Sequence, residues 1–245
     1  MSNIRLGIDI GGSGIKGALI DLESGELLTD RVKLYTPQPA VPATMGEAVG
    51  TIVRGFDYDG PVGVGFPAVV REGIVSTANN IDPEWVGTSA VEVFGAATGL
   101  DVSVVNDADA AALCEARYGV ARNRSGLVIV LTFGTGIGSG FLVGGELVPN
   151  VELGMLELEG HSPAETFFSA KARSRQDLSW GEWGSRVNRF LTHVTRVFSP
   201  ELIAVGGGVA RKWDKWEEHI DQTLPVVRAE RANNAGIVGA ATIVG

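Results

Sequence analysis

The chain has 245 residues, of which 44% are hydrophobic, so it can form one large domain or two modest ones. Its formal net charge of −9 argues against general nucleic-acid binding. The single cysteine, Cys114, excludes an intrachain disulfide and a cysteine zinc site. No apolar run approaches the length of a membrane span, and the first residues, MSNIRLG, lack an apolar signal core. We therefore expect a cytoplasmic protein with no membrane partner.

Residues 6–21 predict a phosphate-binding hairpin. Two apolar runs, residues 6–10 and 15–20, are typical of strands. The turn between them consists of small residues whose backbone can approach a ligand closely, namely Gly11, Gly12, Ser13 and Gly14. Successive backbone N–H groups in such a turn can bind an anion, and Lys16 adds a positive charge. Asp9, at the end of the first strand, is a candidate Mg²⁺ ligand, directly or through water.

The glycines of this hairpin also fit a different motif. Gly12-x-Gly14-x-x-Gly17 matches the dinucleotide-binding fingerprint, in which a helix begins within the glycines. The residues that follow, IKGALID and then a Ser-Gly turn, favour a strand instead. A dinucleotide oxidoreductase therefore stays as an alternative, which a helix after Gly14 would support.

The chain up to residue 118 predicts alternating strands and helices. We expect further strands at residues 26–35, 62–67, 69–75 and 102–105, and helices at 44–56, 88–98 and 110–118. Thr44 is the predicted cap of the first helix, and Gly99 is predicted to end the second. Residues 37–42 contain three prolines and predict an extended loop.

A polar tetrad, Asn106-Asp107-Ala108-Asp109, follows the strand at 102–105 and opens a helix. The carboxyl end of a strand is where α/β proteins usually place ligand-binding and catalytic groups. The alternative is that Asn106 or Asp107 only caps the helix.

The hairpin pattern returns after residues 127–131. Gly134-Thr135-Gly136-Ile137 repeats the form of Gly12-Ser13-Gly14-Ile15, and strand-like residues follow it at 141–143. Glycine-rich turns also occur without any ligand. Two matching hairpins nevertheless predict two related halves that face one phosphate chain.

The remaining elements complete an α/β pattern. We expect a strand at 146–148, with Glu157 and Glu159 on the solvent face of a strand within 151–161, and Glu152 beside Gly154 as a candidate site residue. Helices are predicted at 163–172, at 180–198, which is long and amphipathic, and at 234–241. A strand at 201–205 runs into three glycines, Gly206, Gly207 and Gly208, where a nucleotide base or phosphate can approach the backbone.

Charge is distributed unevenly along the chain. Residues 1–109 hold 6 basic and 15 acidic side chains, a net charge of −9, whereas residues 110–245 hold 14 of each. The basic residues of the second part gather near positions 117–124, 171–175 and 211–215. These groups are either solvated helix faces or parts of a local anion-binding track.

Together these motifs resemble the ROK family of sugar kinases, over essentially the whole chain, and most closely its polyphosphate-using glucokinases. The resemblance implies an α/β fold of the actin-like ATPase (ribonuclease H-like) type, with two domains and a cleft between them. We expect an N-terminal domain at 1–109 and a C-terminal domain at 110–245, with the last helix, 234–244, packing back on the first domain. The Thr36-Pro37-Gln38-Pro39 stretch and the loop from Asn80 to Trp85 resemble the polyphosphate-using branch.

The resemblance also implies residue roles. Asp107 falls on the general-base position, and the sugar-binding positions fall on Asn80, Asn106, Asp107, Glu152 and Glu165. Residues 9–16 and 134–136 match the two phosphate loops, and residues 206–208 match the nucleotide-side loop. The implied reaction is phosphoryl transfer from polyphosphate or ATP, with Mg²⁺ and without zinc, to the 6-hydroxyl of glucose or mannose. A homodimer is expected, with helix 180–198 as part of the interface.

Two positions depart from the family pattern in the sugar site. Met155 stands where the family has a histidine after Glu-x-Gly, and Ala68 stands where a glycine is usual in Gly-x-Pro-Gly. His161 is nearby in sequence but is not an obvious replacement. A catalytically weak sugar-binding regulator therefore stays as a second alternative, which sugar binding without turnover would reveal.

Overall fold

The computed structural model describes residues 3–231 and 234–244. These residues fall into two compact units, one formed by the chain up to Cys114 together with the segment from Asn234, and the other by the chain from Glu115 to Asn233. The first unit runs past the boundary expected at residue 109, because one continuous helix, α3 (Asp107–Tyr118), extends across it.

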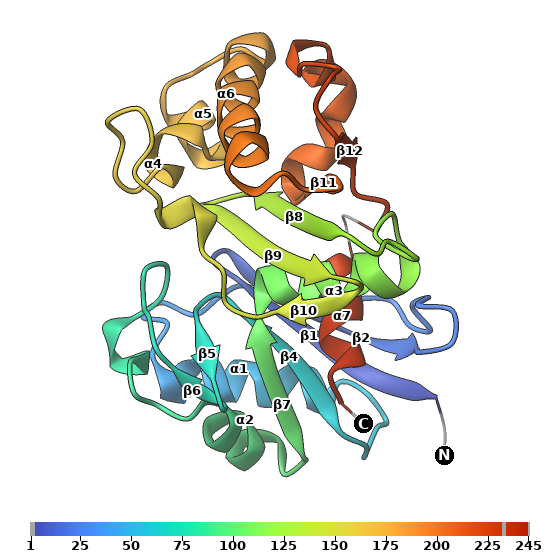
Figure 1. Cartoon of the computed structure of the whole chain (residues 1–245). Helices are drawn as coiled ribbons and strands as arrows, with labels where there is room; N and C mark the ends of the chain where they lie inside the picture. The colour runs from blue at the N-terminus through green and yellow to red at the C-terminus, as the bar shows by residue number, and fades with distance from the viewer. Residues whose placement is uncertain (1–2, 232–233, 245) are drawn as a thin grey trace. The chain divides into compact units, whose positions relative to one another are not determined.

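The first unit contains a five-stranded sheet in the order β3-β2-β1-β4-β7 (Figure 1). Its strands are β1 (Ile4–Gly11), β2 (Gly14–Asp21), β3 (Val32–Leu34), β4 (Val62–Phe66) and β7 (Val102–Asn106). β2 pairs antiparallel with both β1 and β3, whereas β4 pairs parallel with both β1 and β7.

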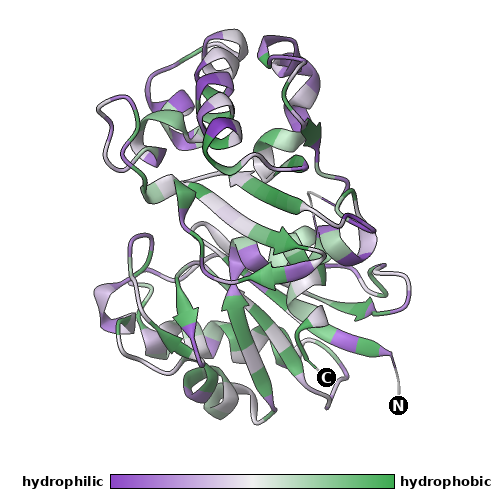
Figure 2. Ribbon diagram, in the orientation of Figure 1, coloured by the Kyte–Doolittle hydropathy of each residue, from purple (hydrophilic) through white to green (hydrophobic). Residues whose placement is uncertain are grey.

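The second unit repeats this topology. Its sheet has the order β10-β9-β8-β11-β12, formed by β8 (Leu127–Phe133), β9 (Ile137–Val143), β10 (Glu146–Val148), β11 (Leu202–Gly206) and β12 (Val226–Arg228). β8, β9 and β10 are antiparallel, and β11 pairs parallel with β8 and β12. The prediction of two related halves is therefore confirmed. Figure 2 shows that the strands of both sheets are largely hydrophobic.

Helices cover both faces of the first sheet. On one face lie α1 (Pro42–Arg54) and α2 (Ala90–Thr98). Helix α1 packs closely against β2 there, because a Cβ added at Gly17 would lie only 2.6 Å from Ile52 Cγ2. On the other face α7 (Ala235–Thr242) packs so closely that a Cβ at Gly7 or Gly63 would clash with its backbone. A small arm, β5 (Val70–Arg71), β6 (Ile74–Val75) and the 3₁₀ turn η1 (Pro83–Trp85), completes this unit.

Aromatic side chains dominate the core of the second unit. Helix α6 (Trp180–Phe198) buries Trp183 and Phe190 completely, and both rings pack edge-on against Phe133 of β8. Shorter elements complete this unit: α4 (Glu165–Phe168), α5 (Ala170–Arg175), and the 3₁₀ turns η2 (Leu153–Met155), η3 (Gly208–Lys215) and η4 (Glu217–His219). Within the described residues, no helix is both long and apolar enough to span a bilayer.

Several element predictions were wrong in detail. Thr44 does not cap α1, which begins at Pro42, because proline is well suited to the first helical position. The strand expected at 26–35 is reduced to β3 and a bridge at Leu27. The strand expected at 69–75 is the hairpin β5–β6, and the helix expected at 163–172 breaks at Ser169, where an extended conformation separates α4 from α5.

Residues 151–161 do not form the expected strand. They form η2 and a tight turn closed by a bridge between Leu158 and His161, with Glu159 at a φ of 54°. Glu157 and Glu159 are exposed as expected, but from this turn and not from the face of a strand.

Candidate active site

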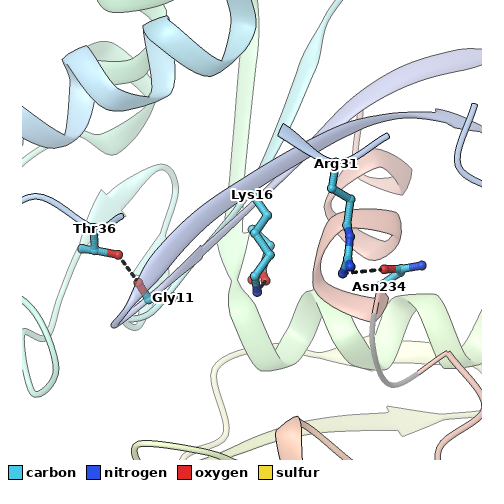
Figure 3. A network of polar contacts seen from close by, with 6 residues as sticks. Gly11, Lys16, Arg31, Thr36 and Asn234 are labelled. Atoms are coloured by element: carbon cyan, nitrogen blue, oxygen red, sulfur yellow. Dashed lines mark hydrogen bonds and ion pairs between the residues drawn. The ribbon is translucent and has the colours of Figure 1, made fainter. Parts of the chain in front are cut away.

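The first glycine hairpin is present as predicted from the sequence. Gly11 pairs with Gly14 at the ends of β1 and β2, so Gly12 and Ser13 form an exposed two-residue loop. The Thr36 hydroxyl donates a hydrogen bond to the Gly11 carbonyl at 2.6 Å, which ties the segment after β3 to this turn (Figure 3). Because β2 and not a helix follows Gly14, the dinucleotide-binding alternative is wrong.

A charge pair lies beside the hairpin. Asp9 and Lys16 are opposite each other in the β1–β2 register, and Lys16 Nζ lies 3.3 Å from Asp9 Oδ2. A Cβ at Gly236, in the first turn of α7, would lie 2.7 Å from Asp9 Oδ1, so glycine there leaves space for the carboxylate. Both side chains stay partly exposed, at 33% for Lys16 and 21% for Asp9, so they can still reach a ligand.

Asn106 makes the cap of α3. Its Oδ1 accepts hydrogen bonds from the N–H groups of Ala108 and Asp109, at 2.8 and 3.1 Å. Its Nδ2 donates to the carbonyl of Ala68 at 3.1 Å, and the side chain is buried. The capping interpretation therefore holds for Asn106, which keeps one amide hydrogen for a ligand.

Asp107 is the first residue of α3 and is half-buried. Because Asn106 supplies the cap, the helix does not need the Asp107 carboxylate for this purpose. A negative charge is favourable at a helix N-terminus. A carboxylate is therefore electrostatically favoured at this position. Asn80 lies exposed in the loop between β6 and η1.

The second unit holds a second hairpin with a carboxylate behind it. The turn at Gly134, Thr135 and Gly136 joins β8 to β9, and its Gly134 carbonyl accepts a hydrogen bond from the Lys171 N–H at 3.0 Å. Glu165 Oε2 accepts a hydrogen bond from the Ile137 N–H at 3.0 Å, directly after the turn.

Two glycines form the notch that holds Glu165. A Cβ at Gly136 would lie 2.1 Å from Glu165 Oε2, and a Cβ at Gly154 would lie 3.2 Å from the same atom. The second glycine belongs to the Glu152-Leu153-Gly154-Met155 motif, so Glu165 connects this motif to the glycine turn at residues 134–136. These glycines are required for close approach of the carboxylate.

Sequence reasoning did not identify the contribution of Ser139. Its hydroxyl donates to the Val151 carbonyl at 2.5 Å and accepts from the Leu153 N–H at 2.9 Å, with the side chain 1% exposed. It thereby positions Glu152, the half-buried residue between its two partners. The available signal was a hydroxyl residue within an otherwise apolar, buried strand.

Met155 and His161 have different environments. Met155 ends η2 with its side chain 39% exposed, beside the glutamate notch. His161 stacks on Phe167, with 3.8 Å between the ring centroids and 8° between the planes, and the Arg186 guanidinium lies 4.0 Å from the same ring centroid. His161 therefore packs against α4.

The three glycines after β11 serve different purposes. Gly207 has a φ of +77°, and a Cβ there would lie 2.7 Å from the Phe133 carbonyl oxygen, so this glycine lets β11 end against β8. A Cβ at Gly208 would meet nothing within 4 Å, so the backbone there is open to a ligand. Gly206 is the last residue of β11.

A resident metal would find few protein ligands. Residues 3–231 and 234–244 contain no group of three or more His, Cys, Asp or Glu side chains placed to hold an ion. Mg²⁺ in phosphoryl-transfer sites is usually bound by one or two carboxylates, with waters and substrate phosphates as its other ligands. Asp9, next to the first hairpin, fits that limited role.

Comparison with known proteins places this geometry in context. A family model described as "ROK family" matches residues 5–172. The polyphosphate glucokinase of Mycobacterium tuberculosis H37Rv is 47% identical over 236 residues, which cover 96% of this chain and 89% of the relative. The crystal structure of inorganic polyphosphate/ATP-glucomannokinase from Arthrobacter sp. strain KM is 46% identical, with a TM-score of 0.95 over 98% of this chain and 97% of the other.

A more distant solved structure has the same architecture. A ROK family glucokinase from Streptomyces griseus, in complex with glucose and AMPPNP, has a TM-score of 0.84 over 98% of this chain and 99% of the other. At 24% identity this likeness concerns the fold alone.

Proposed function

Because the chain belongs to the ROK family, we propose that it is a glucokinase that uses inorganic polyphosphate or ATP as the phosphoryl donor. Its fold is the actin-like ATPase fold of the sugar kinases. The observation that carries the proposal is the pair of matching glycine hairpins, one in each repeat of the sheet, in a chain 47% identical to a polyphosphate glucokinase.

The reaction joins the 6-hydroxyl oxygen of the sugar to the terminal phosphorus of the donor. The bond between that phosphorus and the bridging oxygen breaks, and the shortened polyphosphate or ADP leaves. We assign Asp107 as the group that accepts the hydroxyl proton as the new bond forms. Its place at the start of α3, next to the buried cap residue Asn106, supports this role.

The two turns and Lys16 would bind the donor phosphates. Backbone N–H groups of residues 11–14 and 134–136 can donate to phosphate oxygens, and Lys16 can neutralise charge. Asp9 would hold Mg²⁺, directly or through water, and the bound ion would shield negative charge on the transferred group. With ATP as donor, the open backbone at Gly208 and its neighbours Gly206 and Gly207 would lie on the nucleotide side.

Asn106, Glu152 and Glu165 would bind the sugar hydroxyls, and Asn80 would contact the sugar from the loop before η1. Carboxylates and amides suit this task because they can accept from or donate to adjacent hydroxyl groups. The hydrogen bonds that Asn106 and Glu165 make to the backbone support the proposal, since they hold both side chains in place without help from the sugar.

We also propose a homodimer in which α6 forms part of the interface. Val197, near the end of this helix, is 58% exposed and would be covered in such an assembly. Light scattering coupled to gel filtration should then give twice the mass of one chain.

The experiment that tests the function is a coupled assay for glucose 6-phosphate with Mg²⁺, in which glucose or mannose is combined with long-chain polyphosphate or ATP. Turnover with polyphosphate is expected. Turnover with ATP alone would keep the kinase assignment and remove the polyphosphate donor.

A second candidate, a sugar-binding regulator with little activity, is favoured by one observation. Met155, which is 39% exposed, stands where the family has a histidine, so a hydrogen bond to the sugar is absent or comes from another group. Calorimetric glucose binding without turnover by any donor would identify this case.

A further inference from the structure

We propose that the edge strand β3 extends the first phosphate hairpin into a binding track for linear polyphosphate, with Lys33 and Arg31 as its cationic groups. The inference rests on the proposed function and names the part of the chain that would take the long donor. It concerns phosphates beyond those held in the glycine turn.

The pairing register places the relevant side chains on one face. Asp9 is opposite Lys16, and Lys16 is opposite Lys33, so these three side chains form one row across β1, β2 and β3. Arg31 precedes Lys33 by two residues, which in extended chain places it on the same face about 7 Å away. Figure 3 shows Lys16 and Arg31 projecting to the same side, where Arg31 Nη1 donates to Asn234 Oδ1 at 3.2 Å.

The distribution of charge along the chain makes this row unusual. Residues 1–109 hold only six basic side chains against fifteen acidic ones. Three of those six, Lys16, Arg31 and Lys33, lie together on this face. The rest of the segment is strongly acidic, so a general attraction to anions does not explain the cluster.

Lys33 lacks a neutralising partner within residues 3–231 and 234–244. Lys16 is paired with Asp9, but Lys33 makes no ion pair with any side chain of the described residues, and it directly faces the like charge of Lys16. Like charges opposite each other in a sheet are destabilising. An anion between them would remove this repulsion.

Lys33 reaches the hairpin itself. A Cβ at Gly14 would lie 3.1 Å from Lys33 Cε, so the aliphatic part of Lys33 lies against the glycine turn. Its Nζ lies 5.7 Å from the ring centroid of Tyr35, which is 85% exposed, so the ammonium remains open to solvent. The Thr36–Gly11 hydrogen bond keeps the end of this segment fixed to the turn.

The spacing of the cations fits an extended polyanion. A linear polyphosphate carries a negative charge on every phosphate, so it can contact Lys16 and Lys33 at the turn and Arg31 farther along. ATP has only three phosphates, followed by a neutral sugar and base. The track should therefore discriminate between donors by chain length.

The test uses three variants of the track: Lys33→Gln, Arg31→Gln and the double variant that carries both changes. The control is Arg54→Gln. Arg54 is an exposed cation at the end of α1, on the opposite face of the sheet, and its loss removes the same charge. The KM for long-chain polyphosphate should rise about tenfold in Lys33→Gln and further in the double variant, as expected for lost charge-assisted contacts. The KM for ATP should stay near the wild-type value in all of these variants. In Arg54→Gln the KM for polyphosphate should also stay near the wild-type value.

Direct binding separates this inference from the proposed activity. The affinity for fluorescently labelled long-chain polyphosphate, measured by anisotropy at several salt concentrations, should fall in the double variant, with a shallower salt dependence. If the double variant binds polyphosphate as tightly as Arg54→Gln, or if the KM values for ATP and polyphosphate rise equally, the track is wrong. If the wild type makes no hexose phosphate with any donor, the proposed function fails, and the binding comparison still decides the track.

Discussion

Glu165 shows how single glycines determine the position of a carboxylate that we propose binds the sugar. Its Oε2 lies where the Cβ atoms of larger residues at 136 and 154 would be, and it accepts the Ile137 N–H. This residue therefore depends on three segments that are far apart in the chain. A larger residue at position 136 would therefore displace the Glu165 carboxylate, although Glu165 itself is unchanged.

We predict that Gly136→Ala weakens glucose binding by at least about tenfold, because the added Cβ would displace Glu165 and break a hydrogen bond to a charged acceptor. Glucose affinity is measured by calorimetry without donor. The matched control is Gly134→Ala in the same turn, where a Cβ would meet nothing within 4 Å. Equal glucose affinities for the two variants would show that the Glu165 carboxylate does not bind the sugar.

We predict that Met155→His lowers the KM for glucose by about tenfold, the value of one added hydrogen bond in a partly buried site. The side chain is 39% exposed, so the polar ring does not have to be buried. Met155→Leu, which adds no hydrogen-bonding group, should leave the KM unchanged. A glucose KM that rises in Met155→His would mean that the thioether itself contributes to the sugar site.

The individual residues could be predicted from the sequence to different degrees. The hairpin residues follow from local glycine patterns, because a turn depends mainly on its own residues. For Asn106 the sequence left two roles open, a ligand or a helix cap. Its hydrogen bond to the Ala68 carbonyl could not be predicted, because Ala68 lies 38 positions earlier in the chain. Ser139 was missed because its two partners, Val151 and Leu153, meet it only in the folded chain.

At the scale of elements, α6 depends on a capping box at its start. Ser179 Oγ accepts from the Glu182 N–H, and Glu182 Oε2 accepts from both the hydroxyl and the N–H of Ser179. The Ser179 side chain, and then its N–H, lower the pKa of Glu182 below its usual value of 4.5.

The lowered pKa of Glu182 determines how the stability of the fold changes with pH. A carboxyl group with a depressed pKa in the folded state contributes stability above the unfolded value of 4.5, and loses it as the pH falls through the folded pKa. Glu182→Gln should therefore lower the Tm at pH 7, and the difference from wild type should shrink below pH 4.5. Thermal unfolding monitored by circular dichroism over pH 3–7 measures it.

The control for this prediction is Glu157→Gln, at an exposed acid in the turn after η2. This variant removes one negative charge from the same unit and should not reproduce the pH-dependent change. A Tm difference for Glu182→Gln that is constant from pH 7 to pH 3 would contradict the charge-based role of the capping box.

Elements with strong apolar patterns could be predicted, and those shaped by tertiary contacts could not. Helix α6 was found with its bounds because its pattern is long and its cap is local. Residues 151–161 alternate acids and apolar residues like a strand, but Ser139 takes the Leu153 N–H and Gly154 packs against the Ile137 carbonyl. These contacts leave no backbone ladder for a strand there.

At the scale of the whole molecule, the repeated sheet explains why two hairpins of the same form occur. In each unit the hairpin joins the second and third strands of the same five-stranded order. The sequence predicted this duplication from two four-residue matches. The boundary between the units was expected at residue 109, short of Cys114, because α3 runs continuously across it and carries no break in its sequence pattern.

The most direct test of the account is the rate of hexose 6-phosphate formation by Asp107→Asn beside that of the wild type, with glucose, Mg²⁺ and long-chain polyphosphate. Asparagine preserves the shape of the side chain but cannot accept the hydroxyl proton. We predict a wild type that turns over and a variant slower by about 100-fold to 10,000-fold, with unchanged Tm and glucose affinity. A variant that keeps nearly the wild-type rate would contradict the assignment of Asp107 as the base.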